Sequence, residues 1–414
     1  MIDRIIFILG ILSACNLGVI AMFVSLAVLK KRQYPESTPA LSIIVPAHNE
    51  ESKIMACLTS IAAVAHGRNN IEVICIDDGS TDNTGRIMKD FIQKYQNKIT
   101  GTYIRRDTVG KAHALNAGVQ ASRHELVFTL DADTTIDSSF LNKITSPFSD
   151  PSVGYTFGIL AINPAYQKGW LTHYQALEYS FITLLLRSST ILFGYPIWFC
   201  GAVVCYRRKA LIEMGLFSAD TLTEDVDVSY MLYDKGYKAV FLPDIVAYTE
   251  PMNTIRDLAN QRMRWNYGAI QNAIKHRKLF TIKALILCYL LFSTMLWLLN
   301  SLVMLPTFLT TLTLLVLHDP AESVRYFFMS GTMTGTLQTL ATLGAHSVNN
   351  IYDLIGVMLF TLFTISTLST QRNWRWQTLP TLFTYFSYIC FLQACCVLSF
   401  VKYRGKLSVG FVRS

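Results

Sequence analysis

An apolar run that ends abruptly in two carboxylates is the feature that most constrains this chain. Residues 126–130, LVFTL, have the composition expected of a strand that is buried on both faces of a parallel sheet. The run ends in Asp131-Ala132-Asp133. In open α/β sheets, ligands bind beyond the carboxyl ends of the strands. Two carboxylates placed there can share a divalent cation and the phosphates it carries. An isolated pair of this kind is more often a solvated turn, so the surrounding sequence must decide.

The sequence before this run alternates between strand and helix patterns. This order predicts an α/β domain with a doubly wound, mainly parallel sheet. Such a sheet would gather Pro46, Asp78, Lys111, Asp131 and Asp133 along one edge. No G-x-G-x-x-G follows the first strand, and carboxylates with one lysine suit a metal-bound nucleotide diphosphate better than a dinucleotide. The predicted strands cover residues 41–48, 71–80, 100–106 and 126–130, and the predicted helices begin near residues 49, 83 and 112.

Hydropathy divides the chain into three parts. With 51% hydrophobic residues and a mean hydropathy of +0.34, the chain of 414 residues is too apolar for an ordinary soluble enzyme. The excess lies in the first 29 residues and the last third. We therefore predict a transmembrane helix within residues 1–33, a globular domain over residues 34–280, and three to four further spans within residues 281–414. The topology of the last spans stays open, because basic residues lie on both sides of the final one.

Basic residues beside the apolar segments predict the side of the membrane. Lys30-Lys31-Arg32 follows the first apolar segment, and this basic flank predicts that the next domain lies in the cytoplasm. The predicted location of the protein is therefore the cell (inner) membrane. The net charge of +8 gathers at such flanks rather than in a stripe with aromatic residues, so nucleic acid is not expected as a partner. Residues 170–196 could span the membrane, but an amphipathic helix at the cytoplasmic interface would keep residues 131–133 and 223–225 on one side.

Further polar motifs follow in the second half of the predicted domain. Thr223-Glu224-Asp225 follows a turn, and Gln261, Arg264 and Trp265 lie on one face of a predicted helix. Each motif alone is weak evidence. Asp225 could cap a helix, and Trp265 could anchor the chain at a membrane interface. Arg262 is expected to face phospholipid or solvent.

These motifs together resemble those of the membrane-embedded, processive family 2 glycosyltransferases. That group contains the cellulose, chitin, hyaluronan and poly-N-acetylglucosamine synthases, whose GT-A domains carry D-D-G, D-x-D, T-E-D and Q-x-x-R-W motifs in the order found here. The resemblance implies a GT-A nucleotide-sugar-binding domain embedded between transmembrane helices. The overall layout is most similar to that of the poly-β-1,6-N-acetylglucosamine synthases. Residues 198–201, WFCG, resemble a cellulose synthase loop instead, with Ala202 in place of the usual serine.

The resemblance also implies a role for each matched residue. Asp225 would be the catalytic base, with Glu224 beside it. Asp133 and Asp131 would hold Mg²⁺ or Mn²⁺, which are hard cations that prefer oxygen ligands. The donor would be bound by Pro46, Glu50, Asp78, Lys111, Asp131, Gln261 and Arg264, and the acceptor by Trp198, Cys200, Gly201 and Trp265.

The expected function is inverting, processive transfer from a UDP-sugar to a growing polysaccharide, with help in its export. UDP-N-acetylglucosamine is the expected donor, the lipid bilayer is an expected partner, and a small accessory membrane subunit is a further candidate. The alternatives are a cellulose-, hyaluronan- or chitin-like synthase, or a non-processive transferase that acts on a lipid-linked acceptor. A transporter with a nucleotide-sensing domain is disfavoured, because the apolar segments contain almost no ionisable residues to mark a solute pathway.

Overall fold

The computed structural model describes residues 39–65, 70–107, 110–137, 140–196, 199–279 and 379–403, together with single positions in the flanking segments. The chain divides into two compact units. The larger unit contains residues 27–253 and 268–279, and the smaller contains residues 1–26, 254–267 and 280–404. Most of the residues predicted to cross the membrane lie outside the described ones, so the predicted boundaries at residues 33 and 281 stay predictions.

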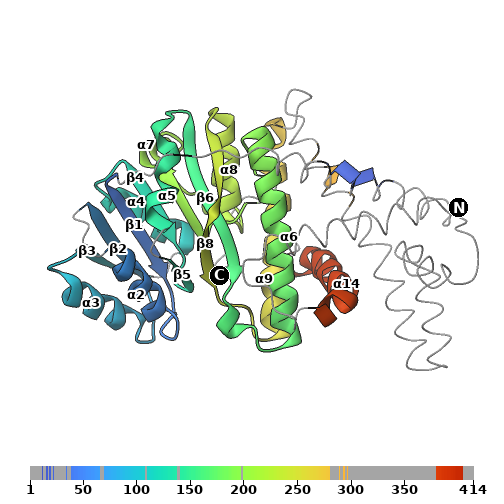
Figure 1. The fold of residues 1–414 in the computed structure, drawn as a ribbon, viewed down its shortest axis with the longest axis horizontal. Coiled ribbons are helices and arrows are strands. Elements are labelled where there is room, and N and C mark those ends of the chain that lie inside the picture. The colour runs from blue at the N-terminus through green and yellow to red at the C-terminus, as the bar shows by residue number, and fades with distance from the viewer. Residues whose placement is uncertain are drawn as a thin grey trace, which may run out of the picture. The chain divides into compact units, whose positions relative to one another are not determined.

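One mixed sheet forms the core of the larger unit (Figure 1). Its strand order is β3-β2-β1-β4-β7-β6-β8-β5. The first half, from β3 to β4, is parallel as predicted. The second half is mixed, because β7 pairs antiparallel with both β4 and β6 and β5 pairs antiparallel with β8, whereas β6 and β8 pair in parallel. The strands are β1 (Leu41–Ala47), β2 (Ile71–Asp78), β3 (Thr100–Arg106), β4 (Leu126–Leu130), β5 (Thr134–Ile136), β6 (Val153–Ile162), β7 (Val203–Arg207) and β8 (Lys238–Thr249).

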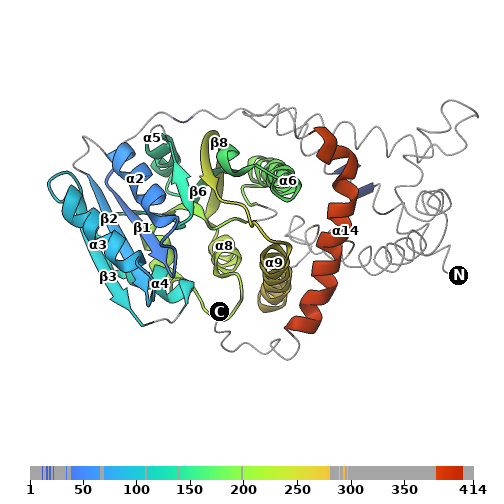
Figure 2. The same cartoon turned by 90° about the horizontal axis from the view of Figure 1, so that it is seen from below.

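Helices cover both faces of this sheet, because successive side chains of each strand point to opposite faces. In β1, Ile43 and Val45 join a core cluster with α2, α3 and α5, whereas Ile44 joins a second cluster with α4, α7 and α8. Figure 2 shows α2 and α5 on one side of the sheet and α4 and α8 on the other. These helices are α2 (Ile54–Ala65), α3 (Thr84–Tyr95), α4 (Lys111–Ala121), α5 (Phe140–Ile144), α7 (Arg208–Glu213) and α8 (Glu224–Asp234).

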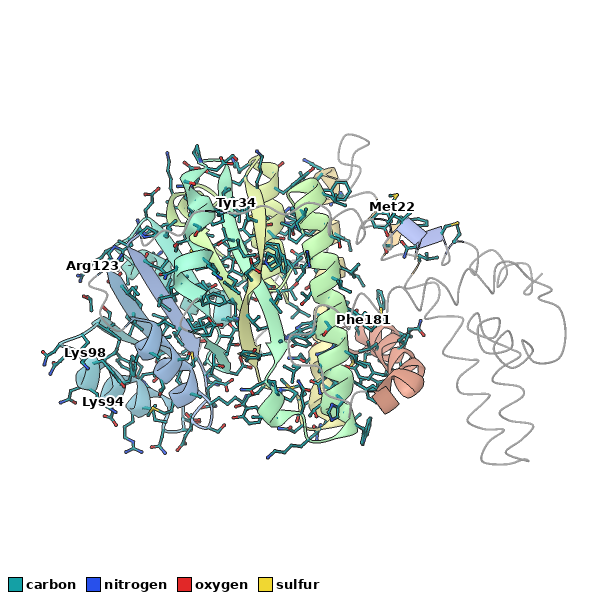
Figure 3. The ribbon with its side chains drawn as sticks, viewed as in Figure 1. Met22, Tyr34, Lys94, Lys98, Arg123 and Phe181 are labelled. Atoms are coloured by element: carbon teal, nitrogen blue, oxygen red, sulfur yellow. The ribbon has the colours of Figure 1, made fainter. Side chains whose placement is uncertain are left out.

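The parallel half of the sheet therefore directs the carboxyl ends of its strands to one edge. The basic side chains labelled in Figure 3 belong to the opposite edge, since Lys98 precedes β3 and Arg123 precedes β4. Arg123 pairs there with the buried carboxylate of Glu72 at 3.5 Å. Exposed basic side chains at that edge cannot serve a ligand bound at the carboxyl ends of the strands.

Residues 170–193 form one long helix, α6 (Trp170–Phe193). Among the described residues, it is the helix that is long and apolar enough to cross a membrane by length and composition, and half of its most apolar window is buried. α6 runs beside β6 and β8 (Figure 1). Leu186 joins the second core cluster, and the Gln175 Nε2 group donates to the Met252 carbonyl at 2.9 Å. The helix thus contributes to the core of the larger unit, and its contact with lipid stays a prediction.

Two helices contribute to the smaller unit. α14 (Leu379–Lys402) lies within residues 281–414, where the further spans are predicted, and the first part of α9 (Ile255–Lys275) also belongs here. Lys402 Nζ donates to Asn260 Oδ1 at 2.6 Å, and the Tyr267 and Tyr403 rings lie 5.1 Å apart. The rest of α9, from Gly268, belongs to the larger unit.

Candidate active site

The two aspartates at the end of β2 differ in their surroundings. Asp77 is fully buried and accepts hydrogen bonds from Ser80 N, Tyr103 Oη and Arg105 Nη1 at 2.7–2.9 Å. Burial opposes ionisation, but these hydrogen bonds and the Arg105 charge outweigh it and hold the pKa of Asp77 below its usual value. Asp77 therefore stabilises the turn that follows β2, a role that the sequence analysis missed. Asp78 accepts the backbone N–H of Gly110 at 2.9 Å, beside the start of α4.

The turn after β1 is joined to the turn after β2. The helix predicted from residue 49 begins only at Ile54, because Asn49 adopts a left-handed conformation with φ 55°. The Asn49 side chain accepts the Thr81 N–H at 2.8 Å, and the Glu50 N–H donates to Thr84 Oγ1 at 2.8 Å. The Glu50 carboxylate pairs with Lys53 at 3.1 Å. Pro46 is buried in β1. The predicted donor contacts of Glu50 and Pro46 stay predictions.

Lys111 joins the D-x-D and T-E-D motifs. Its Nζ atom lies 2.6 Å from Asp131 Oδ1 and 3.7 Å from Glu224 Oε1. Burial opposes the charged form of Lys111, but the two carboxylates outweigh it and raise the pKa of the ammonium group. Asp131 and Glu224, which are 93 positions apart in the sequence, therefore meet at one lysine. A single positive charge between two carboxylates, still 40% exposed, is well placed to meet an incoming diphosphate.

Asp133 lies in a second acidic group near the same strand end. Burial and, next, the negative charge of Asp131 raise the pKa of Asp133 to about 6. Lys53 and Glu50 also act on it electrostatically. A divalent cation would relieve the repulsion between Asp131 and Asp133, so this pair has the charge and the oxygen ligands that Mg²⁺ or Mn²⁺ requires. Within the part of the chain that the structure describes, no three His, Cys, Asp or Glu side chains are arranged to bind a metal.

Residues 199–202, here called the acceptor loop after the role that the resemblance implies, contact the T-E-D motif. The backbone N–H of Gly201 donates to Asp225 Oδ2 at 2.8 Å, and the N–H of Val226 donates to Oδ1 at 2.9 Å. Burial and the charges of Asp225 and Asp131 raise the pKa of the Cys200 thiol to about 12, so this thiol is neutral beside the carboxylates. α8 begins at Glu224, so Asp225 lies in its first turn and Thr223 occupies the capping position. Trp198 lies outside the described residues.

Buried polar side chains fix the start of α8 against the second part of α9. Asn272 is fully buried, and its Nδ2 group donates to Thr223 Oγ1 at 2.9 Å and to the Thr223 carbonyl at 3.1 Å. Asp227, also fully buried, pairs with Lys275 at 2.8 Å and with His276 at 2.5 Å. The sequence analysis missed all of these. The sequence offers one signal that Asp227 lies near the site, which is its position one helical turn after Glu224.

The Q-x-x-R-W residues lie in the first part of α9, as predicted for a helix. Arg262 was predicted to face lipid or solvent, and this is wrong: it is buried, with its guanidinium 4.2 Å from the centre of the Trp265 ring, and it donates to Gln261 Oε1. The planar guanidinium can stack on an indole face, which explains how a charged residue is buried there. Gln261, Arg264 and Trp265 belong to the smaller unit, so their predicted contacts with donor and acceptor stay predictions.

Known proteins show similarity to this chain in sequence and in fold. Residues 42–214 match the model of the "Glycosyl transferase family 2" family. A poly-β-1,6-N-acetyl-D-glucosamine synthase of Staphylococcus epidermidis is 30% identical over 247 residues, which cover 59% of this chain and 57% of the relative. A synthase of the same name from Staphylococcus aureus is 28% identical over 234 residues, covering 55% of this chain and 54% of the relative. The matched region thus spans slightly more than half of these relatives.

A solved structure resembles nearly the whole fold. The mannosyltransferase PcManGT of Pyrobaculum calidifontis, in complex with GDP-Man and Mn²⁺, superposes with a TM-score of 0.59 at 20% identity. The superposition covers 95% of this chain and 97% of the mannosyltransferase. At this identity, the likeness establishes a shared GT-A-type fold and no more. The family match over residues 42–214 and the curated relatives support a glycosyltransferase domain of the family 2 type in this chain.

Proposed function

We propose that this enzyme transfers a sugar from a UDP donor, UDP-N-acetylglucosamine in the first instance, to the end of a growing polysaccharide. The proposal rests above all on one observation. Asp225 is held by two backbone N–H groups beside the pair formed by Lys111 and Asp131. A carboxylate base thus lies next to a cationic site suited to a diphosphate. The curated relatives, which are named for the synthesis of poly-β-1,6-N-acetyl-D-glucosamine, supply the candidate sugar.

Asp225 is the base in the proposed reaction. It removes the proton from the acceptor hydroxyl as the hydroxyl oxygen attacks the anomeric carbon, and the bond from that carbon to the diphosphate oxygen breaks with inversion. UDP leaves with the electron pair of that bond. Lys111 stabilises the negative charge that develops on the diphosphate. Asp131 and Asp133 would hold Mg²⁺ or Mn²⁺, which supplies further positive charge at the leaving group.

A donor screen in membranes tests the proposal. Membranes that contain the enzyme are incubated with a panel of UDP-sugars and with GDP-mannose, and the products are sized. We expect long polymer from UDP-N-acetylglucosamine. Polymer from another UDP-sugar would assign one of the alternative synthases. Transfer that stops after one sugar would assign a non-processive transferase, and the absence of both transfer and donor hydrolysis would leave the transporter as the better explanation.

Export through the membrane is the remaining part of the proposal. A hydroxyl-rich polymer cannot cross hydrocarbon unaided, because its polar groups would lose their hydrogen bonds with water. The apolar segments of residues 281–414, with or without a small accessory subunit, are the proposed conduit from a cytoplasmic catalytic domain. Sealed vesicles with the catalytic domain outside should accumulate polymer that an added glycosidase cannot reach. Polymer that remains fully open to the glycosidase would rule out export by this chain alone.

Metal removal should abolish transfer. Asp133 is close enough to Asp131 for the charge of Asp131 to raise its pKa, and a divalent cation would add to the positive charge that Lys111 and Lys53 bring to this acidic pair. Excess EDTA is therefore expected to reduce transfer by at least about 10²-fold, and Mn²⁺ or Mg²⁺ added beyond the chelator should restore it. Isothermal titration of Mn²⁺ in the presence of UDP should give weaker binding for Asp133→Asn than for Asp90→Asn, an exposed control on α3. Full activity in excess EDTA would contradict the assignment.

A further inference from the structure

We propose that the backbone N–H of Gly201 is the positioning group for the catalytic base, so that the acceptor loop orients Asp225 as well as the acceptor sugar. This inference rests on the function proposed above, in which Asp225 removes the acceptor proton. It assigns Gly201 an action on the base, in addition to the contact with the sugar that the family resemblance implies.

Two backbone donors determine the orientation of the Asp225 carboxylate. Gly201 N–H binds Oδ2 at 2.8 Å, and Val226 N–H binds Oδ1 at 2.9 Å. Val226 is the next residue in α8, so its hydrogen bond fixes the carboxylate only relative to its own helix. The Gly201 hydrogen bond fixes it relative to the loop that faces the acceptor. Because a base must meet its proton at hydrogen-bonding distance, an error of about 1 Å in its position can cost about 10²-fold in rate.

Only glycine allows this close approach at position 201. A Cβ atom added there would lie 2.3 Å from Asp225 Cβ and 2.8 Å from Asp225 Oδ2. Both distances are far below van der Waals contact, and Asp225 Cβ is attached directly to the backbone of α8. Alanine would therefore separate the loop from α8 and lengthen the hydrogen bond. The restriction arises from space and not from backbone conformation, since Gly201 is not among the residues with positive φ.

The elements on both sides of this contact are held in place. On the loop side, the Phe199 ring packs edge-on against Tyr155 at 5.3 Å and Phe157 at 5.7 Å, and the Ala202 carbonyl accepts the Asp131 N–H at 3.0 Å. The loop is thereby joined to β6 and to the end of β4. On the other side, the Asn272 amide holds Thr223, immediately before α8. Neither side can shift freely to accommodate a larger residue 201.

The proposal predicts that Gly201→Ala lowers the turnover rates of two reactions to the same extent. Transfer to a sugar acceptor and hydrolysis of the UDP-sugar by water both need the base, so both turnover rates should fall by about 10²-fold. The KM for the donor and the affinity for UDP should stay as in the wild type, because the hydrogen bond does not involve the donor. Gly169→Ala is the matched control, since a Cβ atom at Gly169 meets no atom within 4 Å and Gly169 has extended backbone angles.

The two possible roles of Gly201 differ in their outcomes. If Gly201 acts only on the acceptor, hydrolysis will keep its wild-type rate and the KM for the acceptor will rise, which would overturn the proposal. Phe199→Leu, which weakens the aromatic support of the loop, should show the same parallel losses at about tenfold. UDP binding shows whether Gly201→Ala folds. If it does not fold, Phe199→Leu distinguishes between the two roles. Wild-type transfer in Asp225→Asn would instead refute the proposed function, because the base itself would then be misassigned.

Discussion

Asp225→Asn is expected to reduce sugar transfer by a factor on the order of 10² to 10⁴ while leaving UDP affinity near that of the wild type. The amide has the shape of the carboxylate, and its oxygen can still accept the N–H of Gly201 or Val226. The amide cannot, however, take the proton of the acceptor hydroxyl. The fold and the donor site should therefore survive, and the chemical step alone should fail.

Rates of transfer and calorimetric UDP binding, measured on the same preparations, test this prediction. Asp234→Asn is the matched control, because Asp234 lies at the end of the same helix and is exposed. A loss of UDP affinity in proportion to the loss of activity would place Asp225 in the nucleotide site. In that case another residue, with Glu224 the first candidate, would be the base.

Lys111→Met should damage donor binding and chemistry together. Its ammonium group is the described cation that contacts both Asp131 and Glu224, whose side chains are only 27% and 12% exposed. Without it, these carboxylates repel each other and the incoming diphosphate, and the leaving group loses a stabilising charge. Loss of one such group typically lowers turnover by about 10² to 10³-fold. We therefore expect a loss of that size in transfer and, unlike in Asp225→Asn, a clear loss of UDP affinity.

A lysine outside the site provides the comparison for Lys111→Met. Lys209 is 77% exposed and pairs with Glu213 at 3.8 Å one helical turn away, so Lys209→Met should behave as the wild type. Normal UDP affinity in Lys111→Met, with transfer reduced, would restrict Lys111 to the chemical step. Normal values for both would show that the pair with Asp131 is merely structural.

The parallel half of the sheet could be predicted from the sequence because its signal is local. Strands β1, β2 and β4 are buried on both faces, so their apolar runs are continuous and end sharply in polar residues. The carboxyl ends of parallel strands meet at one edge, which was enough to bring Asp78, Lys111 and Asp131 together. The position of Asp131 and Asp133 directly after the end of β4 was predicted in the same way. The mixed half could not be predicted, because β7 pairs antiparallel with β4 across 72 intervening residues and with β6 across 40, and local sequence does not encode the direction of such pairing.

What the tertiary structure alone decided is the position of polar groups in the interior. The apolar pattern shows which face of an element is buried, but it does not show which polar side chains are buried with partners. Asp77, Asp227 and Asn272 look like surface residues in the sequence, yet each is fully buried and hydrogen-bonded to a distant residue. Arg262 is buried because Trp265 offers it an aromatic face. The contact of Gly201 with Asp225 likewise joins residues 24 positions apart, which only the packing of the loop against α8 brings together.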